Sequence, residues 1–224
     1  MQYLSIESVN EIGTSAKQAN IDYLYLTEPS KIHDFKELSE ERSRAGITLE
    51  WQKPDSLGGF LSVEYTVVCS DETQKTIQTF ENLNITTLHV PDLEIGNEYR
   101  LTVTASNDEG TSQQSDAVEF TFFVSPTAPT NLGKRIEFKY ANKLVLEWKA
   151  PDNFGGLPNV TYTVYSVEPL LEAATVIASG LTTREFEIMN PMIGFMYQFQ
   201  VSATNAWGES PLSDVFELVY MTEP

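Results

Sequence analysis

Apolar and polar residues alternate along many short segments of the chain. Alternation of this kind puts every second side chain on the same face of a β-strand, as in a strand with one face in a core. No segment of the chain shows a convincing helical pattern, so the alternation predicts an all-β fold. The clearest cases are Val63, Tyr65 and Val67 in one segment, and Tyr99, Leu101, Val103 and Ala105 in another.

Two long portions of the chain each contain seven predicted strands, separated by turn formers such as Pro-Asp and Gly-Gly. Seven short strands joined by turns predict an antiparallel sandwich of two sheets. Residues 73–80 are expected to form an edge strand. The predicted strands are 31–38, 46–52, 62–70, 73–80, 86–90, 98–107 and 117–124 in the first portion, and 131–140, 143–148, 160–167, 172–178, 184–188, 196–205 and 215–221 in the second.

One stretch, an alternating strand that runs into a turn, occurs three times along the chain. Its asparagine falls at Asn10, Asn107 and Asn205, so the copies are 97 and then 98 residues apart. A second landmark, Leu-Glu-Trp followed by Pro-Asp and Gly-Gly, begins at Leu49 and recurs 97 residues on at Leu146. Repeats of this length are whole domains, each with its own core.

The repeat predicts three domain regions: 1–29, 30–126 and 127–224. Residues 1–29 correspond only to the last two strands of a domain, and an isolated hairpin is at best marginally stable in water. Two explanations remain open at this point. Either the sequence is a piece of a longer polypeptide, or the hairpin completes a sheet in another molecule.

The joins between the repeats are short and contain prolines, Pro29 at the first join and Pro126 with Pro129 at the second. Proline fixes the backbone angle φ and removes a hydrogen-bond donor, so it stiffens a join and stops a strand from continuing through it. The chain is therefore expected to act as a semi-rigid row of modules.

With the strand order in hand, the chain resembles tandem fibronectin type III domains over nearly all of its length. The residues that carry the resemblance recur in order: Trp51 and Trp148 in the second strand, Pro54 and Pro151 after them, Tyr65 and Tyr162 in the third strand, and Tyr99 and Tyr197 in the sixth. The resemblance implies tandem seven-stranded Ig-like sandwiches in which the two tryptophans are core aromatics.

The resemblance also implies a tyrosine corner, in which a buried tyrosine sends its hydroxyl group back to the backbone. Tyr99 fits this pattern, since Leu93 and Gly96 precede it. The second repeat keeps Gly194 and Tyr197 but has Pro191 where the first has Leu93. The second corner therefore departs from the pattern.

The repeated turn contains Gly13, Gly110 and Gly208, which we expect to adopt positive φ in a hairpin. Trp207 lies at the tip of the last copy, where an aromatic residue has little reason to belong to a core. It is a candidate interaction loop, and packing against a neighbouring module is the equally weighted alternative.

The net charge of −18 is spread over every part of the chain, so it predicts a solvated acidic surface. Such a surface repels phosphate backbones and anionic lipids, and we expect no nucleic-acid partner and no direct membrane contact. The hydrophobic share of 41% is typical of globular domains. Cys69 is the single cysteine, which excludes an internal disulfide.

No catalytic, cofactor or metal site is expected, and the sequence does not predict an enzyme. His33 and His89 have no cysteine or carboxylate at metal-ligand spacing. Acidic pairs such as Glu40-Glu41, Asp71-Glu72 and Asp108-Glu109 fall in different predicted loops and lack the order of a calcium loop. Cys69 has no partner base and is expected to be a small, partly buried thiol.

Asn84 and Asn159 begin Asn-x-Thr triplets and are candidate N-glycosylation sites. They support a secreted location only weakly, because one or two such triplets are expected by chance in a chain of this length. No Arg-Gly-Asp tripeptide is present.

Three functional hypotheses follow. The first is a set of spacer and protein-binding modules in a large adhesion, receptor or extracellular structural protein. The second is an intracellular scaffold of the muscle or cytoskeletal type. The third is an accessory region of a secreted enzyme. All three need protein partners whose identity the sequence does not give.

Overall fold

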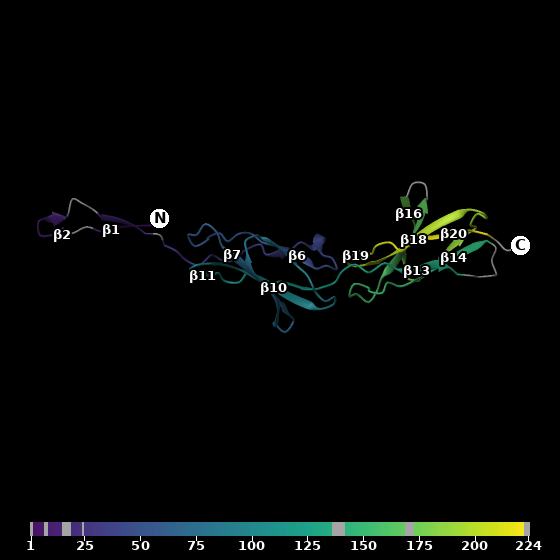
Figure 1. The fold of residues 1–224 in the computed structure, drawn as a ribbon, viewed down its shortest axis with the longest axis horizontal. Coiled ribbons are helices and arrows are strands. Elements are labelled where there is room, and N and C mark those ends of the chain that lie inside the picture. Colours follow the sequence, from purple (N-terminus) through teal and green to yellow (C-terminus); the bar gives the residue numbers. More distant parts are fainter. Residues whose placement is uncertain are drawn as a thin grey trace. The chain divides into compact units, whose positions relative to one another are not determined.

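The structure is a computed structural model that describes residues 2–6, 9–14, 19–23, 25–135, 142–168 and 173–221 (Figure 1). It divides into two compact units. One consists of Met1–Asp92 with Glu98–Phe120, and the other of Leu93–Asn97 with Thr121–Pro224. The described residues contain one short 3-10 turn, η1 (Ser39–Glu41), and otherwise only strands, turns and loops.

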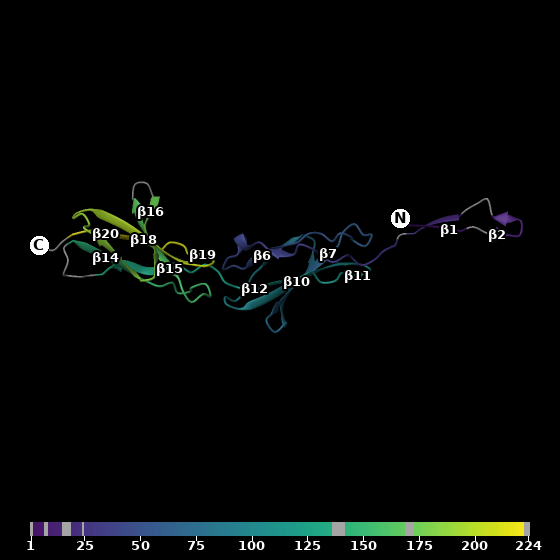
Figure 2. The ribbon, with the colours of Figure 1, turned by 180° about the vertical axis from the view of Figure 1, so that it is seen from behind.

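The first unit contains a sandwich of two antiparallel sheets. One sheet has the order β5-β6-β9, and the other has the order β11-β10-β7-β8 with β12 also paired to β10 (Figure 2). The strands are β5 (Lys36–Glu37), β6 (Ile47–Glu50), β7 (Glu64–Asp71), β8 (Thr76–Leu83), β9 (Thr87–Val90), β10 (Glu98–Asn107), β11 (Gly110–Thr111) and β12 (Val118–Thr121).

The second unit repeats this topology strand for strand. Its sheets have the orders β13-β14-β17 and β16-β15-β18-β19, with β20 paired to β18. The strands are β13 (Thr130–Lys134), β14 (Lys143–Lys149), β15 (Thr161–Glu168), β16 (Ala173–Leu181), β17 (Glu185–Met189), β18 (Met196–Asn205), β19 (Gly208–Glu209) and β20 (Phe216–Val219). The predicted all-β class of antiparallel sandwiches is confirmed.

The N-terminal residues form antiparallel pairs in the part that the structure describes. These are β1 (Gln2–Ile6) with β4 (Ala19–Tyr23), and β2 (Val9–Asn10) with β3 (Gly13–Thr14). This region therefore contains antiparallel strands, and its assignment to the last two strands of a domain stays a prediction.

Alternation correctly identified the core face of the two central strands. Tyr65, Val67 and Cys69 in β7 are buried, and the intervening residues are partly exposed. The indole ring of Trp51 packs edge-on against Tyr65 with ring centroids 5.5 Å apart. This contact joins the two sheets of the first unit. Trp148 and Tyr162 repeat it in the second unit, also at 5.5 Å.

The first predicted strand of each repeat was too long. Only Lys36–Glu37 of the segment 31–38 forms a strand, because Asp34 adopts a left-handed conformation (φ 55°) that interrupts the extended backbone. Asn131 has the same conformation (φ 53°) in the second unit, where the β13 register shifts between Thr130 and Gly133. Residues 136–140 of the prediction lie outside the described part of the chain.

Cys69 is more deeply buried than expected, with no exposed surface. Burial raises the pKa of its thiol to about 11, because the thiolate would lose its hydration. The thiol therefore stays protonated at neutral pH, and it is an inert part of the core.

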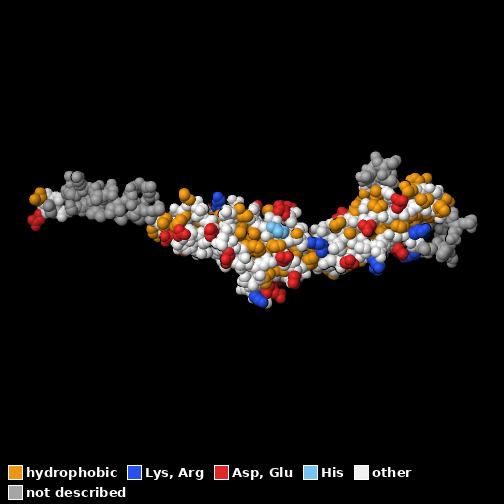
Figure 3. All heavy atoms as spheres, viewed as in Figure 1, with side chains coloured by type: hydrophobic (Ala, Val, Ile, Leu, Met, Phe, Trp, Pro, Cys, Tyr) orange, Lys and Arg blue, Asp and Glu red, His pale blue; other side chains and the backbone are white. Residues whose placement is uncertain are grey.

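Acidic side chains are distributed over the visible surface of both units, and no single acidic face stands out (Figure 3). The figure also shows apolar side chains gathered on the second unit near β18 and β20. The described residues include no helix with the length and apolar character needed to span a bilayer.

Candidate functional site

In the first unit, the repeated asparagine fastens the chain segment that enters the sandwich. The side-chain amide of Asn107 donates hydrogen bonds to the carbonyl oxygens of Thr27 (2.7 Å) and Leu57 (3.1 Å). Its side-chain oxygen accepts from the backbone of Glu109 and Gly110 in its own hairpin. We call this arrangement the linker clamp. It joins a hairpin, a loop and an entering segment that are far apart in sequence.

The second unit contains the same clamp. The side-chain amide of Asn205 donates to the carbonyl oxygens of Val124 (2.8 Å) and Phe154 (2.9 Å), and its oxygen accepts from the Trp207 backbone (2.7 Å). The entering segments also bond the loops directly. Thr27 N donates to Gly58 O in the first unit, and Val124 N donates to Gly155 O in the second.

A second attachment follows three residues later. Ser30 N donates to Ser56 O (2.9 Å), and the Ser30 hydroxyl accepts from Ser56 N (3.0 Å). Thr127 and Asn153 form the same two bonds in the second unit, at 2.9 and 3.1 Å. Each entering segment is thus held at two points, and the prolines at 29 and 126 lie between them.

The first glycine of each Gly-Gly pair is required by this attachment. Gly58 has φ +70°, and a Cβ atom there would lie 1.8 Å from the Thr27 carbonyl oxygen. Gly155 has φ +77°, and its Cβ would lie 1.9 Å from the Val124 oxygen. A side chain at either position would occupy the place of the entering backbone.

The second glycine of each pair receives an apolar side chain from the entering segment. A Cβ atom on Gly59 would lie 2.8 Å from the side chain of Leu26. On Gly156 it would lie 2.6 Å from Phe123 and 2.9 Å from Ile95, both in the same unit. The clamp therefore combines backbone hydrogen bonds with a small apolar contact.

The sequence showed the repeat of these residues but not their role. The asparagines were expected to serve the turn, and the three turn glycines do have positive φ, as predicted. The contact between Asn107 and Thr27 spans 80 residues, so no local pattern reveals it. The recurrence of Ser30 and Ser56 as Thr127 and Asn153, both 97 residues on, was the available signal.

Buried serines, also missed from the sequence, hold the chain that follows the turn. The Ser112 and Ser115 hydroxyls accept hydrogen bonds from Ala105 N and Val103 N, both at 3.0 Å. Ser210 and Ser213 do the same in the second unit. These hydroxyls bond β10 and β18 on the edge opposite to β7 and β15, which fixes the base of each hairpin.

The hairpin that carries Trp207 is well anchored. The Glu209 carboxylate accepts hydrogen bonds from the Ser202 hydroxyl and from the Tyr165 hydroxyl. These two bonds, that from Ser202 first, lower the pKa of Glu209. The Trp207 side chain itself is 41% exposed. A rigid hairpin with an aromatic residue at its tip suits either of the two roles predicted for Trp207.

The core aromatics are as the resemblance implied, and the second tyrosine corner is present although its sequence departs from the pattern. Trp51 and Trp148 are buried, with 2% and 5% of their surface exposed. The hydroxyl oxygen of Tyr197 accepts a hydrogen bond from the backbone of Met192 (2.9 Å). The corner of the second unit is thus formed although Pro191 replaces leucine there.

The titratable residues considered for chemistry lie apart. His33 lies outside the strands, 4.0 Å from Asp55, and His89 in β9 contacts the Ala45 carbonyl oxygen at 3.2 Å. Within the described residues, no group of three or more His, Cys, Asp or Glu is placed to hold a metal ion. Asn84 and Asn159 are both exposed, in a turn after β8 and in a loop before β15.

Exposed apolar residues gather at one end of the second unit, between β17 and β18 and after β20. Two of them correspond to residues already described: Ile193 to Ile95, and Met221 to Phe123. The match follows from the hydrogen bonds, because Gly96 N donates to Phe122 O and Gly194 N donates to Tyr220 O. Ile193 is 67% exposed and Met221 is 73% exposed.

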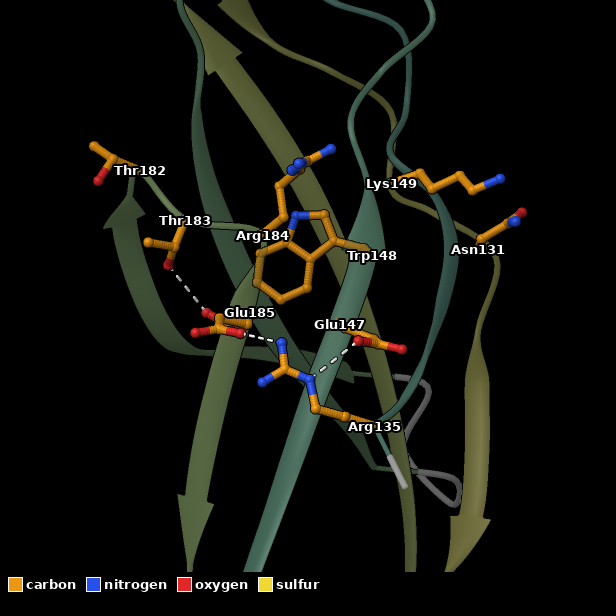
Figure 4. Close-up of a pocket in the computed structure, with 9 residues that line it drawn as sticks. All are labelled: Asn131, Arg135, Glu147, Trp148, Lys149, Thr182, Thr183, Arg184 and Glu185. Atoms are coloured by element: carbon orange, nitrogen blue, oxygen red, sulfur yellow. Dashed lines mark hydrogen bonds and ion pairs between the residues drawn. The ribbon is translucent and has the colours of Figure 1, made fainter. Parts of the chain in front are cut away.

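A surface pocket of about 790 Å³ lies on the β13-β14-β17 sheet (Figure 4). The Arg135 guanidinium bonds both acidic residues of the pocket, Glu147 (3.4 Å) and Glu185. Figure 4 shows Arg184 and Arg135 at opposite ends of the Trp148 indole. The lining residues are Asn131, Arg135, Glu147, Trp148, Lys149, Thr182, Thr183, Arg184 and Glu185.

Two antiparallel sandwiches with the same strand topology and a core tryptophan each define this protein as a tandem array of Ig-like β-sandwich modules. Residues 32–121 match the sequence model of the family described as "Fibronectin type III domain". Residues 32–121 therefore belong to the fibronectin type III family. The second unit has the same topology and the same clamp.

The chain is similar to several long proteins. It is 28% identical over 222 residues to Fibronectin type-III domain-containing protein 3A of Homo sapiens, covering 92% of this chain and 17% of that one. It is 27% identical over 233 residues to Myomesin-2 of Homo sapiens, covering 97% and 16%. The chain thus spans less than a fifth of the length of these relatives.

Among solved structures, the chain is similar to the FN1-FN3 domains of chicken CNTN1. The TM-score is 0.49 with 16% sequence identity, and the match covers 97% of this chain and 74% of that one. The family and the sequence relatives support a non-catalytic interaction or structural role.

Proposed function

We propose that the chain forms spacer and protein-binding modules of a larger multidomain adhesion, receptor or extracellular structural protein. The observation that carries this proposal is the linker clamp, which both units build from corresponding residues. A clamp on each entering segment makes the join semi-rigid, so the modules act as spacers. We keep the domain boundaries predicted from the repeat, 1–29, 30–126 and 127–224, as part of the proposal.

The exposed apolar end of the second unit supports the same function. Ile95 and Phe123 contact Gly156, whereas their counterparts Ile193 and Met221 are exposed. This end is suited to receive the Gly-Gly loop of a further module of the same type. The partners proposed for the array are accordingly neighbouring modules and other proteins, and Trp207 is proposed as part of an interaction loop.

The clamp can be tested by replacing Asn205 with alanine. Two hydrogen bonds that hold the entering segment would be lost, and each is worth about 0.5–1.5 kcal/mol. We expect hydrogen exchange at the Val124 amide to become about 5- to 30-fold faster, which corresponds to about 1–2 kcal/mol. Hydrogen-exchange NMR measures this rate directly.

The matched control is Asn142→Ala, because Asn142 is exposed and its side chain forms no hydrogen bond in the described part of the chain. It should leave the Val124 rate unchanged. Equal rates in the Asn205 variant and the unmodified protein would show that the clamp does not hold the join, and the spacer proposal would lose its basis.

The location can be tested through the two candidate glycosylation sites. We propose an extracellular or cell-surface protein, with a cytoplasmic scaffold as the alternative. Asn84 and Asn159 are both exposed, so a glycan fits at either position. Mass analysis of the native protein is expected to find glycans there. Unmodified asparagines at both positions would favour the alternative, a cytoplasmic scaffold. The similarity to Myomesin-2 is compatible with that alternative.

A further inference from the structure

The pocket on the β13-β14-β17 sheet is lined in part by Trp148. Trp148 is 95% buried, and its indole Nε1 forms no hydrogen bond with the described residues. Nε1 has almost no solvent-accessible surface, so the indole is a reporter of the pocket and not a donor to a ligand there. Trp51 has the same unpaired Nε1 in the first unit, so this feature belongs to both repeats.

In the second repeat, three of the residues that line this pocket are cationic. Backbone hydrogen bonds show which positions correspond in the two repeats. Arg135 N donates to Val145 O as Leu38 N donates to Thr48 O, so Arg135 corresponds to Leu38. Trp148 N donates to Arg184 O as Trp51 N donates to Thr86 O, so Arg184 corresponds to Thr86. Lys149 follows Trp148, and Gln52 follows Trp51. Three cationic side chains of the pocket thus replace Leu38, Thr86 and Gln52 of the first repeat.

Two of the three cations are available to a ligand. Arg135 is engaged with Glu147 and Glu185 and compensates part of their charge. The side chains of Arg184 and Lys149 form no ion pair or hydrogen bond with the described residues, and both are exposed. The pocket therefore carries a net positive charge in a chain whose net charge is −18.

We propose that this pocket binds a carboxylate side chain of an extended acidic peptide segment in a protein partner. The carboxylate would accept hydrogen bonds from the Arg184 guanidinium, with Lys149 adding charge. The inference deepens the protein-binding role proposed above and rests on it. It gives that role a location and a ligand class.

Two observations favour a peptide over a polyanionic glycan. Residues 182–184 of the pocket lead into β17, which pairs with β14 alone within the described residues and so leaves one strand edge open. An open edge accepts the backbone of an extended peptide. In addition, the acidic surface of the chain repels a long polyanion, whereas a short peptide with one inserted carboxylate meets only the pocket.

NMR of the tryptophan indoles can test the proposal, since the chain has three tryptophans and hence three indole N–H signals. The probe is a capped tetraglutamate peptide, and a capped tetraglutamine peptide is its neutral counterpart. We expect tetraglutamate to shift the Trp148 signal and leave those of Trp51 and Trp207 unchanged. Tetraglutamine should shift none of the three.

The test variant is Arg184→Gln, which should weaken tetraglutamate binding about tenfold or more by removing a charged hydrogen bond. The control is Arg100→Gln, which removes the same charge from the first unit, where Arg100 pairs with exposed Glu119. It should not change binding at Trp148.

Three results would overturn the proposal: a Trp148 signal that tetraglutamate does not move, equal binding by both peptides, or undiminished binding by the Arg184 variant. A shift produced by a heparin oligosaccharide but not by tetraglutamate would assign the pocket to a sulfated glycan instead. None of these results alters the exchange rate of Val124, so the pocket and the spacer role are tested separately.

Discussion

Replacing Arg42 by methionine is expected to lower the free energy of unfolding of the first sandwich by about 3–5 kcal/mol. Arg42 forms two hydrogen bonds with the Glu37 carboxylate, from Nε to Oε1 (2.6 Å) and from Nη2 to Oε2 (2.5 Å). The Arg42 side chain is 3% exposed and that of Glu37 is 10% exposed. Without the guanidinium, a buried carboxylate would remain with no opposite charge.

Packing adds to this effect. The Arg42 guanidinium lies over the ring of Phe120, 4.6 Å from its centroid, and Phe120 in turn packs 6.0 Å from Tyr99. An arginine in such a place contributes contact area as well as charge. Methionine keeps part of the contact area, so the variant mainly reports the lost ion pair.

Urea unfolding followed through the Trp51 indole signal measures the loss in this unit. The double variant Glu37→Met with Arg42→Met should be more stable than Arg42→Met alone, because it removes both charges together. Lys36→Met is the control, since Lys36 is largely exposed and its pair with Glu50 should contribute much less to stability than the buried pair. A loss below about 1 kcal/mol in the Arg42 variant would contradict the expectation.

The parts of the fold that sequence predicted are those that depend on local periodicity. β7 and β10 have strict alternation, and Tyr65 and Tyr99 lie on the buried faces that it indicates. The recurrence of Trp51 as Trp148 gave the module plan, because a core residue keeps its place when a domain is duplicated. The edge position predicted for 73–80 is also confirmed, since β8 ends its sheet.

The parts that sequence did not predict depend on contacts across long separations or on single backbone angles. The left-handed Asp34 shortens a predicted strand, and alternation carries no sign of it. Glu37 and Arg42 are five residues apart around an irregular turn, so no helix or strand spacing marks them as a pair. Charged side chains are mostly exposed in proteins, whereas the turn brings these two together and places Arg42 against Phe120.

The pocket shows a different limit of the sequence. Arg135 and Leu38 occupy the same place in the two repeats, yet this match depends on hydrogen bonds that only the structure provides. The spacing of 97 residues holds for β7 and β15 but changes to 98 before β9 and β17, so Arg184 corresponds to Thr86. The replacement of Leu38 by Arg135, and of Thr86 by Arg184, can be recognised only when the hydrogen-bond register of both repeats is known.

Replacing Gly58 by alanine is expected to detach the entering segment of the first unit at a cost of about 2–5 kcal/mol. An alanine in a left-handed conformation costs about 1–2 kcal/mol. The new Cβ would also lie 1.8 Å from the Thr27 carbonyl oxygen, which cannot stay in place. The bonds from Thr27 N to Gly58 O and from Asn107 to Thr27 O would be lost, at about 0.5–1.5 kcal/mol each.

Gly59→Ala is a closely matched control, because Gly59 also has positive φ (+89°) in the same turn. Its Cβ would meet the end of the Leu26 side chain at 2.8 Å and the Tyr25 carbonyl oxygen at an ordinary 3.4 Å, and the leucine can change its rotamer. The backbone strain is therefore similar in the two variants, and only the Gly58 variant displaces the entering backbone. Hydrogen exchange at the Thr27 amide should accelerate strongly in Gly58→Ala and little in Gly59→Ala. Equal acceleration in both would mean that backbone strain, and not the clamp, governs the join.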